Sequence, residues 1–115
     1  MNTVQSTTGV RGKRVRFIWK DGPTKGTTHE HAFHDDGTVE WHAVKAGADA
    51  TGKADVERPR YSDEPVGDDV RLVSYLSRSG FTLTVALNYA DGTITGVASD
   101  GKTWTPVHGS FEVVR

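Results

Sequence analysis

The stretch 29-HEHAFHDDGTVEW-41 decides the fold, because two short β-prone runs flank a turn signal. Two registers are available for this hairpin. A two-residue Asp-Gly turn would place Phe33 opposite Glu40 and would mix polar and apolar side chains on both faces. A three-residue loop over 35–37, with its glycine left-handed at a bulge, pairs Phe33 with Val39 instead. We therefore predict the three-residue loop.

This register sorts the side chains of the hairpin into two faces, and a slip of one residue would reverse every one of them. The predicted inner face carries Phe33, Val39, Trp41 and Ala43, together with His29 and His31. The face predicted to contact water carries Glu30, His34, Glu40 and His42. The two interior histidines locate the candidate site.

Length and composition indicate one small domain of 115 residues, with a flexible segment over 1–12 and a single domain over 13–115. The net charge of -1 disfavours nucleic acid as a partner. The absence of cysteine excludes disulfides and thiolate chemistry. No apolar run is long enough for a signal peptide or a membrane span, so we expect a cytoplasmic protein without membrane contact.

Turn signals recur between short runs of alternating polarity, as in an antiparallel meander. We predict eight strands, near 14–20, 27–34, 38–45, 58–62, 69–77, 81–89, 93–98 and 103–114. Up-and-down strands in this number favour an all-β antiparallel β-barrel, which leaves no exposed edges. The long loop from Ala46 to Val56 either covers one mouth of the barrel or is a plain connector, with room for one short helical turn.

The later hairpins follow the same logic. A three-residue loop at 78–80 aligns Tyr75 with Leu83, unless Leu72 and Leu76 take the core positions of that strand instead. A two-residue Asp-Gly turn at 91–92 aligns Leu87 with Gly96. The small residue at this position leaves room for a ligand or for a crossing side chain.

A family resemblance rests on motifs spread from about Gly12 to Val114. These are GPTKG at 22–26, HAFHDDGTV at 31–39, VSYLS at 73–77, FTLTV at 81–85, LNY at 87–89 and the ending from Trp104 to Phe111. In their order and spacing the chain resembles the MoaF-like family, named for a molybdenum-cofactor biosynthesis protein F. The resemblance implies a lipocalin-like or calycin-like barrel with an interior large enough for a ligand, and it implies no particular chemistry.

A more distant resemblance is to phenolic acid decarboxylases, which are barrels of the same class. Their first-strand Tyr-x-Tyr falls on Phe17 and Trp19, and their catalytic glutamate falls on Ser77. Both departures remove groups that the decarboxylation requires, so we do not expect that reaction here.

The His29 and His31 side chains lie at i and i+2 on one strand face, about 7 Å apart. A metal site would need a third ligand, and we expect neither a metal nor another cofactor. The simplest interpretation is that one of these two histidines fills the core and hydrogen-bonds to Tyr75 or Ser77. As a proton-transfer pair they are more credible than as metal ligands, because burial would keep a neutral base available. We take His29, His31 and Tyr75 as hypothetical catalytic groups.

Interior aromatic and hydroxyl side chains form the candidate ligand-binding set. Its members are Phe17, Trp19, Phe33, Trp41, Ser77 and Leu83. Ordinary core packing explains at least half of the aromatic members. An eight-stranded barrel is either filled by its own side chains or holds one small ligand.

Three functions fit this pattern. The first is a binding barrel that encloses a small apolar or aromatic ligand, and the second is a lyase or isomerase in which an interior histidine moves a proton on a carbonyl or carboxylate compound. The third is an assembly module without a cavity. Strand edges near either terminus could support a homodimer. The basic cluster at 11–16 and the acidic run at 63–69 are expected to be solvated, the first along a strand edge and the second in a loop.

Overall fold

The structure is a computed structural model that describes residues 9–44, 59–77 and 80–114. These residues form eight strands and no helix. The strands are β1 (Arg14–Trp19), β2 (Thr28–Phe33), β3 (Val39–Val44), β4 (Tyr61–Pro65), β5 (Val70–Leu76), β6 (Thr82–Asn88), β7 (Thr93–Ser99) and β8 (Trp104–Val114). Accordingly, no helix capable of crossing a membrane occurs in the described part of the chain.

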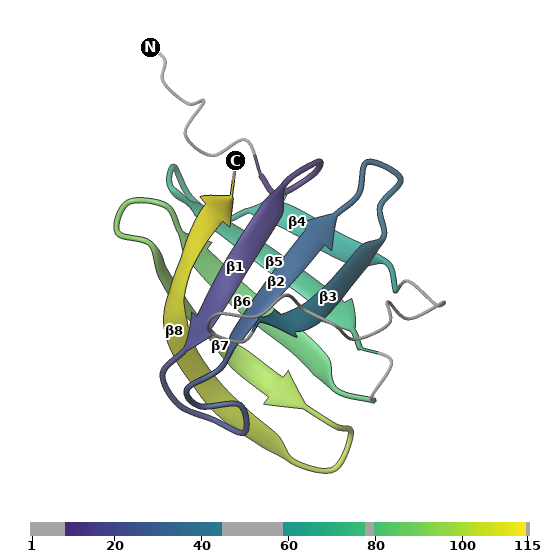
Figure 1. The fold of residues 1–115 in the computed structure, drawn as a ribbon, viewed down its shortest axis with the longest axis vertical. Coiled ribbons are helices and arrows are strands. Elements are labelled where there is room, and N and C mark those ends of the chain that lie inside the picture. Colours follow the sequence, from purple (N-terminus) through teal and green to yellow (C-terminus); the bar gives the residue numbers. More distant parts are fainter. Residues whose placement is uncertain (1–8, 45–58, 78–79, 115) are drawn as a thin grey trace.

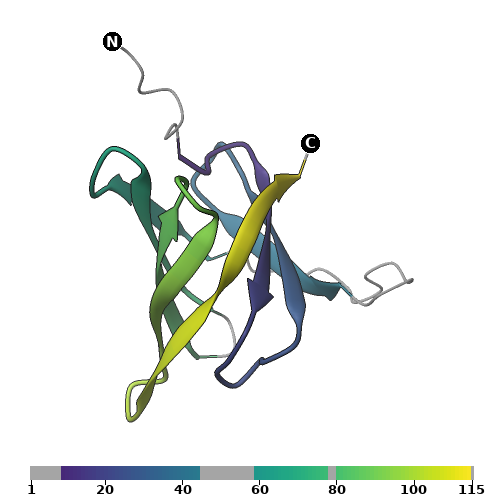
Figure 2. The same ribbon diagram turned by 90° about the vertical axis from the view of Figure 1, so that its left-hand side faces the viewer.

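All eight strands belong to one antiparallel sheet in the order β3-β2-β1-β8-β7-β6-β5-β4. The sheet curls strongly on itself, so that β3 and β4 approach each other from its two ends (Figure 1, Figure 2). They are joined by one bridge, Thr38 with Arg60, and by backbone hydrogen bonds on either side of it. The predicted all-β up-and-down architecture is confirmed, as a barrel-like sheet that is open between β3 and β4 rather than fully closed.

The pairing of β1 with β8 corrects two predictions. It runs from Arg14 opposite Val114 to Trp19 opposite Gly109, so the first and last strands cover each other's edges. The terminal strands therefore do not offer the edges that a homodimer was expected to use. The basic cluster likewise does not follow an edge, because β1 pairs with β2 on its other side.

The hairpin that decides the fold has the predicted register. Phe33 lies opposite Val39 and His31 lies opposite Trp41, and Gly37 has a positive φ of 90°. The His34 N–H donates to the Thr38 carbonyl at 2.8 Å, which leaves three residues in the loop. The register is therefore as predicted, and His31, Phe33 and Val39 are buried on the inner face, whereas Ala43, predicted on the same face, is exposed near the end of β3.

The structure also decides two other registers: that of β5, for which the sequence left two alternatives, and that of β7, for which the prediction was wrong. In β5, Tyr75 lies opposite Leu83 and is buried, whereas Leu76 is exposed, so the first alternative is confirmed. In β7, Leu87 lies opposite Ile94 instead of Gly96, because the loop spans four residues, 89–92. The shift of two residues keeps every side chain on its predicted face. It is favoured by the Asp91 carboxylate, which accepts from the Thr93 N–H and hydroxyl at the loop's end.

The space beside Gly96 belongs to the protein itself. A Cβ at this position would meet the Thr84 carbonyl oxygen and would lie 2.8 Å from Val85 Cγ1. The glycine therefore permits two strands to pack closely and is not part of a ligand site. The missing Cβ makes room mainly for the backbone of β6 at Thr84 and Val85, and also for the Val85 side chain.

The fourth strand lies later than predicted, at Tyr61–Pro65 instead of 58–62. Pro59 precedes it, and its carbonyl accepts from the Val39 N–H at 2.9 Å. The loop predicted from Ala46 to Val56 lies outside the described residues.

The predicted flexible segment over 1–12 includes residues that the structure places against the sheet. Val10 is fully buried, and its N–H donates to Asp63 Oδ2 at 2.8 Å. The other oxygen of the same carboxylate accepts from Arg71 Nε at 2.9 Å. Asp63 is therefore not part of a solvated acidic loop, as the acidic run suggested, but holds Val10 in the core.

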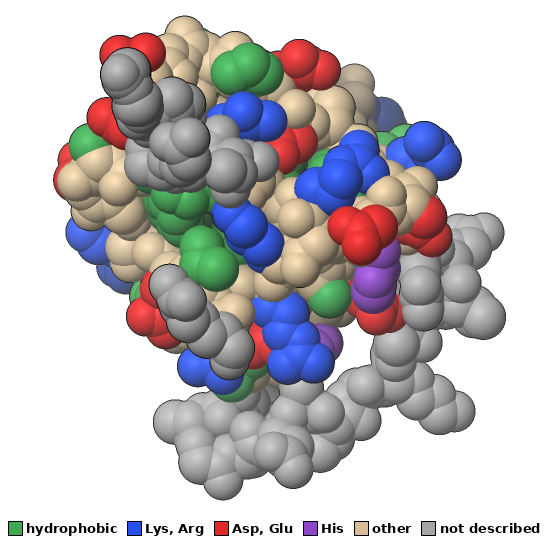
Figure 3. All heavy atoms as spheres, turned by 90° about the horizontal axis from the view of Figure 1, so that it is seen from above, with side chains coloured by type: hydrophobic (Ala, Val, Ile, Leu, Met, Phe, Trp, Pro, Cys, Tyr) green, Lys and Arg blue, Asp and Glu red, His purple; other side chains and the backbone are tan. Residues whose placement is uncertain are grey.

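The interior of the barrel differs between its two ends. We call the end with the loops 34–38, 66–69 and 89–92 the closed end, and the end with the loops 20–27, 77–81 and 100–103 the open end. The closed end is the upper one in Figure 1, and Figure 3 shows its surface with acidic and basic side chains interspersed. Fully buried aliphatic and aromatic side chains fill this half, namely Val10, Val15, Phe33, Val39, Val73, Leu87 and Ile94.

The outer face of β1 and β2 carries an ion-pair cluster. Glu30 accepts from Arg16 Nε at 2.9 Å, and Arg14 Nη1 lies 3.7 Å from the same carboxylate. Glu30 points outward as predicted, but the two arginines cover it and leave little of it in contact with water. The remainder of the predicted water-contacting set is part-exposed, with His34 3.1 Å from Glu40.

Candidate functional site

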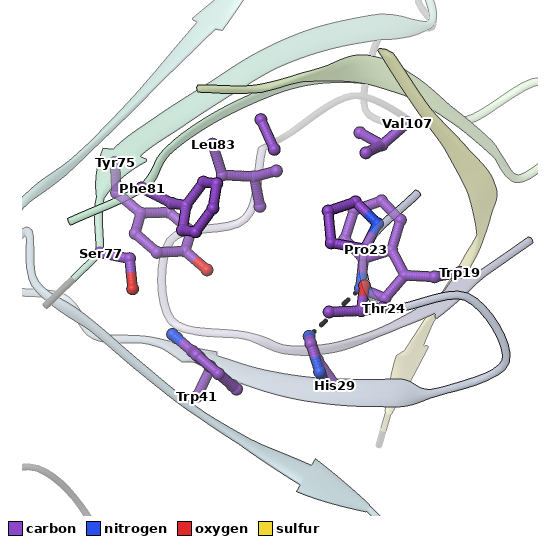
Figure 4. A pocket seen from close by; sticks show the side chains of 11 residues that line it. Trp19, Pro23, Thr24, His29, Trp41, Tyr75, Ser77, Phe81, Leu83 and Val107 are labelled. Carbon is purple, nitrogen blue, oxygen red and sulfur yellow. Dashed lines mark hydrogen bonds between the residues drawn. The ribbon is translucent and has the colours of Figure 1, made fainter. Parts of the chain in front are cut away.

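A pocket of about 250 Å³ opens at the open end of the barrel. Eleven residues line it: Trp19, Pro23, Thr24, His29, Trp41, Tyr75, Ser77, Phe81, Leu83, Ala98 and Val107. Figure 4 shows their side chains converging from opposite walls on a common space. None of them carries a carboxylate, an ammonium or a guanidinium group.

Strand alternation explains how most of these side chains reach the pocket. Trp19 ends β1, His29 lies near the start of β2, and Trp41 lies on β3, so that three adjacent strands supply one wall. Tyr75 and Leu83 are paired neighbours on β5 and β6 and form part of the opposite wall. Because antiparallel strands end and begin at the same edge, these positions meet at the open end.

The loop at 20–27 forms part of the rim. The Asp21 carboxylate accepts from the His108 backbone N–H at 2.7 Å and lies 2.8 Å from His108 Nδ1. The hydrogen bond from the His108 side chain, followed by that from its backbone, lowers the pKa of Asp21. This contact ties the loop to β8, and Pro23 and Thr24 of the loop line the pocket together with Val107 of β8.

The floor of the pocket is formed by Tyr75, whose hydroxyl lies 2.8 Å from Nε2 of His31. Tyr75 lines the pocket, whereas His31 does not and has no exposed surface. The His31 ring stacks on Phe17 at 4.1 Å and on Phe33 at 5.6 Å between ring centroids. The tyrosine hydroxyl thus lies between the pocket and a histidine enclosed by aromatic rings.

Burial holds both members of this pair in their neutral forms. Desolvation lowers the pKa of His31 to about 3, with a smaller contribution from His29. Desolvation also raises the pKa of Tyr75 far above its ordinary value. At neutral pH an uncharged imidazole therefore contacts an uncharged phenol.

His29 differs from His31 in exposure and in partners. It lines the pocket and is half-buried, and its Nδ1 accepts from the Trp19 indole Nε1–H at 3.2 Å (Figure 4). The Trp41 ring packs on it with centroids 4.6 Å apart. Burial lowers its pKa. Because the indole proton occupies Nδ1, this nitrogen does not face the pocket as a base.

The structure divides the predicted site residues into two groups. His29, Trp19, Trp41, Tyr75, Ser77 and Leu83 line the pocket. His31, Phe17 and Phe33 lie below it in the packed interior. A proton-transfer role for His31 would therefore have to act through the Tyr75 hydroxyl.

Five lining residues were not predicted. Ala98 and Val107 lie on inner faces that strand alternation would have given had it been followed along β7 and β8. Pro23 and Thr24 come from a loop, where alternation gives no direction, whereas Phe81 begins the predicted strand 81–89 and, two residues before Leu83, lies on the face that alternation gives. Phe81 follows a loop in which the Ser77 N–H donates to the Phe81 carbonyl at 2.6 Å.

The described residues contain no group of three histidine, cysteine, aspartate or glutamate side chains that could hold a metal ion. His29 and His31 share a strand face, but His29 Nδ1 is directed to Trp19 and His31 Nε2 to Tyr75, while His29 Nε2 lies 3.4 Å from the Thr27 hydroxyl. What this arrangement can do chemically is to enclose an uncharged molecule between aromatic walls and offer it a few hydrogen-bonding groups.

Comparison with known proteins supports the fold. No family model matches the chain, and no curated protein matches it. A solved structure from Burkholderia vietnamiensis, described as a putative beta-lactamase, superposes with a TM-score of 0.69 at 18% sequence identity. The match covers 91% of this chain and 95% of that one. The two chains share a fold over nearly their whole lengths.

Proposed function

We propose that this protein is a binding barrel that encloses a small, uncharged, largely apolar or aromatic molecule in the open-end pocket. The observation that carries the proposal is the pocket's lining of two tryptophans, Phe81, Leu83 and Val107 with no charged side chain among its eleven residues. A cavity of about 150 Å³ with apolar walls is large enough for benzene. The volume of about 250 Å³ therefore suits a substituted single ring.

Two further features support binding over a filled barrel. The closed half is already packed by its own side chains, so the fold does not depend on filling the open half. Trp41 and Phe81 are each more than a third exposed at the rim of the pocket. Large aromatic side chains left open to solvent around a cavity are typical of ligand sites. The resemblance to the MoaF-like family agrees with such a barrel and remains a prediction.

The test is a titration with ethylbenzene followed by NMR of the tryptophan indole N–H groups. The sequence contains three tryptophans, of which Trp19 and Trp41 line the pocket and Trp104 is 67% exposed elsewhere. We expect saturable shifts of the first two signals, with the Trp104 signal nearly unchanged.

A blocking variant makes this test specific. Ala98→Leu adds a branched side chain inside the pocket, whereas Thr95→Leu adds the same side chain on the outer face of the same strand. We expect the first variant to lose the shifts and the second to keep them. Shifts that persist in Ala98→Leu, or an absence of shifts in the unmodified protein, would contradict the proposed function.

A further inference from the structure

The Tyr75 hydroxyl is the polar group at the floor of the pocket, and its hydrogen has one of two directions. It either points to His31 Nε2, 2.8 Å away, or points into the pocket while Nε2–H donates to the phenol oxygen. The two arrangements present opposite chemistry to a ligand. In the first, the phenol oxygen is an acceptor for the ligand, and in the second its O–H is a donor.

The chemistry of the pair favours the first arrangement. A phenol O–H is a stronger donor than a neutral imidazole N–H, and an imidazole nitrogen is a stronger acceptor than a phenol oxygen. The O–H···N hydrogen bond is therefore preferred when both groups are neutral. His31 is enclosed by Phe17 and Phe33, and none of the residues that line the pocket around Tyr75 is an aspartate, glutamate, lysine or arginine.

The other ring nitrogen of His31, Nδ1, is buried and has no hydrogen-bond partner among the described residues, so the contact between Nε2 and Tyr75 is what distinguishes the two arrangements. Because the phenol is the stronger donor, the proton of the neutral ring is assigned to Nδ1. Nε2 is then the acceptor, and the lone pairs of the Tyr75 oxygen remain for the pocket (Figure 4).

We propose that the pocket selects uncharged aromatic molecules that carry a hydroxyl group, which donates to the Tyr75 oxygen and extends a hydrogen-bonded chain ending at His31. This inference rests on the proposed function and names its ligand class. A hydroxyl suits the site because it can donate to Tyr75 and also accept a hydrogen bond, and the Trp41 indole lies on the facing wall of the pocket (Figure 4). A carboxylate would enter without a cation to pair with it.

The test uses one scaffold with four substituents. Ethylbenzene, 4-ethylphenol, 4-ethylacetophenone and 4-ethylbenzoate differ only at the position para to the ethyl group, and binding of each is measured by the indole N–H shifts. We expect 4-ethylphenol to bind at least about fivefold more tightly than ethylbenzene, the size of one hydrogen bond. We expect 4-ethylbenzoate to bind more weakly than 4-ethylphenol by about tenfold or more.

Matched variants test whether the tighter binding of 4-ethylphenol depends on the Tyr75 hydroxyl. Tyr75→Phe should bind the phenol and the hydrocarbon with similar affinities. Tyr61→Phe removes a hydroxyl outside the pocket, which donates to the His34 carbonyl at 3.1 Å, and should keep the preference. The comparison of ligands on the unmodified protein stands even where Tyr75→Phe folds poorly.

The outcomes separate the two proposals. A preference for 4-ethylacetophenone over 4-ethylphenol would show that Tyr75 donates to the ligand and would overturn the inference. So would equal binding of all uncharged probes, tight binding of the benzoate, or a phenol preference that survives in a folded Tyr75→Phe. Tight binding of the benzoate would also contradict the proposed restriction to uncharged molecules, whereas in the other cases the binding function itself stands. Failure of every probe to bind would overturn both.

Discussion

The deepest titratable side chain of the candidate site is His31, a neutral imidazole packed between two phenylalanine rings. Its burial lowers the pKa to about 3, against 6.5 for the free side chain. The unfolded chain therefore binds a proton on this residue between pH 6.5 and 3, whereas the folded protein does not. The contribution of His31 to the free energy of unfolding is therefore largest above about pH 6.5 and decreases as the pH falls toward 3.

This dependence predicts the behaviour of His31→Gln. The glutamine amide cannot titrate and can still hydrogen-bond the Tyr75 hydroxyl. Between pH 7 and pH 4 the free energy of unfolding should fall by up to about 3 kcal/mol more in the unmodified protein than in the variant. Urea unfolding across this pH range measures both curves, and carboxylates that titrate contribute equally to each. Parallel curves would show that His31 is not held neutral.

The same residue shows how far the sequence determines the site. Alternation along β2 correctly placed both histidines on the inner face, because a strand's side chains repeat every two residues. Alternation gives the side of the sheet but not the depth within the barrel. His29 and His31 share a face, yet one lies at the pocket and the other lies beneath Tyr75. Depth depends on which side chains other strands send inward at the same level.

At the scale of the strands, the length of each hairpin loop sets the register of the two strands that it joins. The β2–β3 and β5–β6 registers followed from apolar patterning and loop length, whereas the β6–β7 loop proved two residues longer than its Asp-Gly signal indicated. A shift by two residues leaves both faces unchanged, so patterning cannot detect it. Its consequence is that Val85, not Leu87, lies opposite Gly96.

The close contact at Gly96 leads to a matched pair of predictions. A Cβ in Gly96→Ala would meet the Thr84 carbonyl oxygen and lie 2.7 Å from Val85 Cα, both of them backbone atoms that cannot easily move. We expect a loss of about 2–3 kcal/mol from overpacking. Gly67→Ala meets nothing within 4 Å and should change stability little. Urea unfolding of both variants checks this, and equal stabilities would refute the close packing of β6 and β7.

The whole molecule is a barrel that is packed at one end and open at the other. Val10 explains part of this asymmetry, because it fills the closed end while Asp63 holds its N–H. Composition suggested a flexible segment there, since two valines six residues apart among mostly polar residues give no periodic signal. The sequence thus predicted the strands, their order along the sheet and most inner faces. It could not predict which end would be filled, because that depends on contacts between residues 53 positions apart.

The most direct test of the half-filled barrel is a crystal structure of the protein grown with 4-ethylphenol. We predict that the ring lies in the open-end pocket between Trp19, Trp41 and Leu83, with its hydroxyl about 2.7 Å from the Tyr75 oxygen. The closed half should remain packed around Val10. A pocket filled by the protein's own side chains, with the phenol absent or bound elsewhere, would contradict the account.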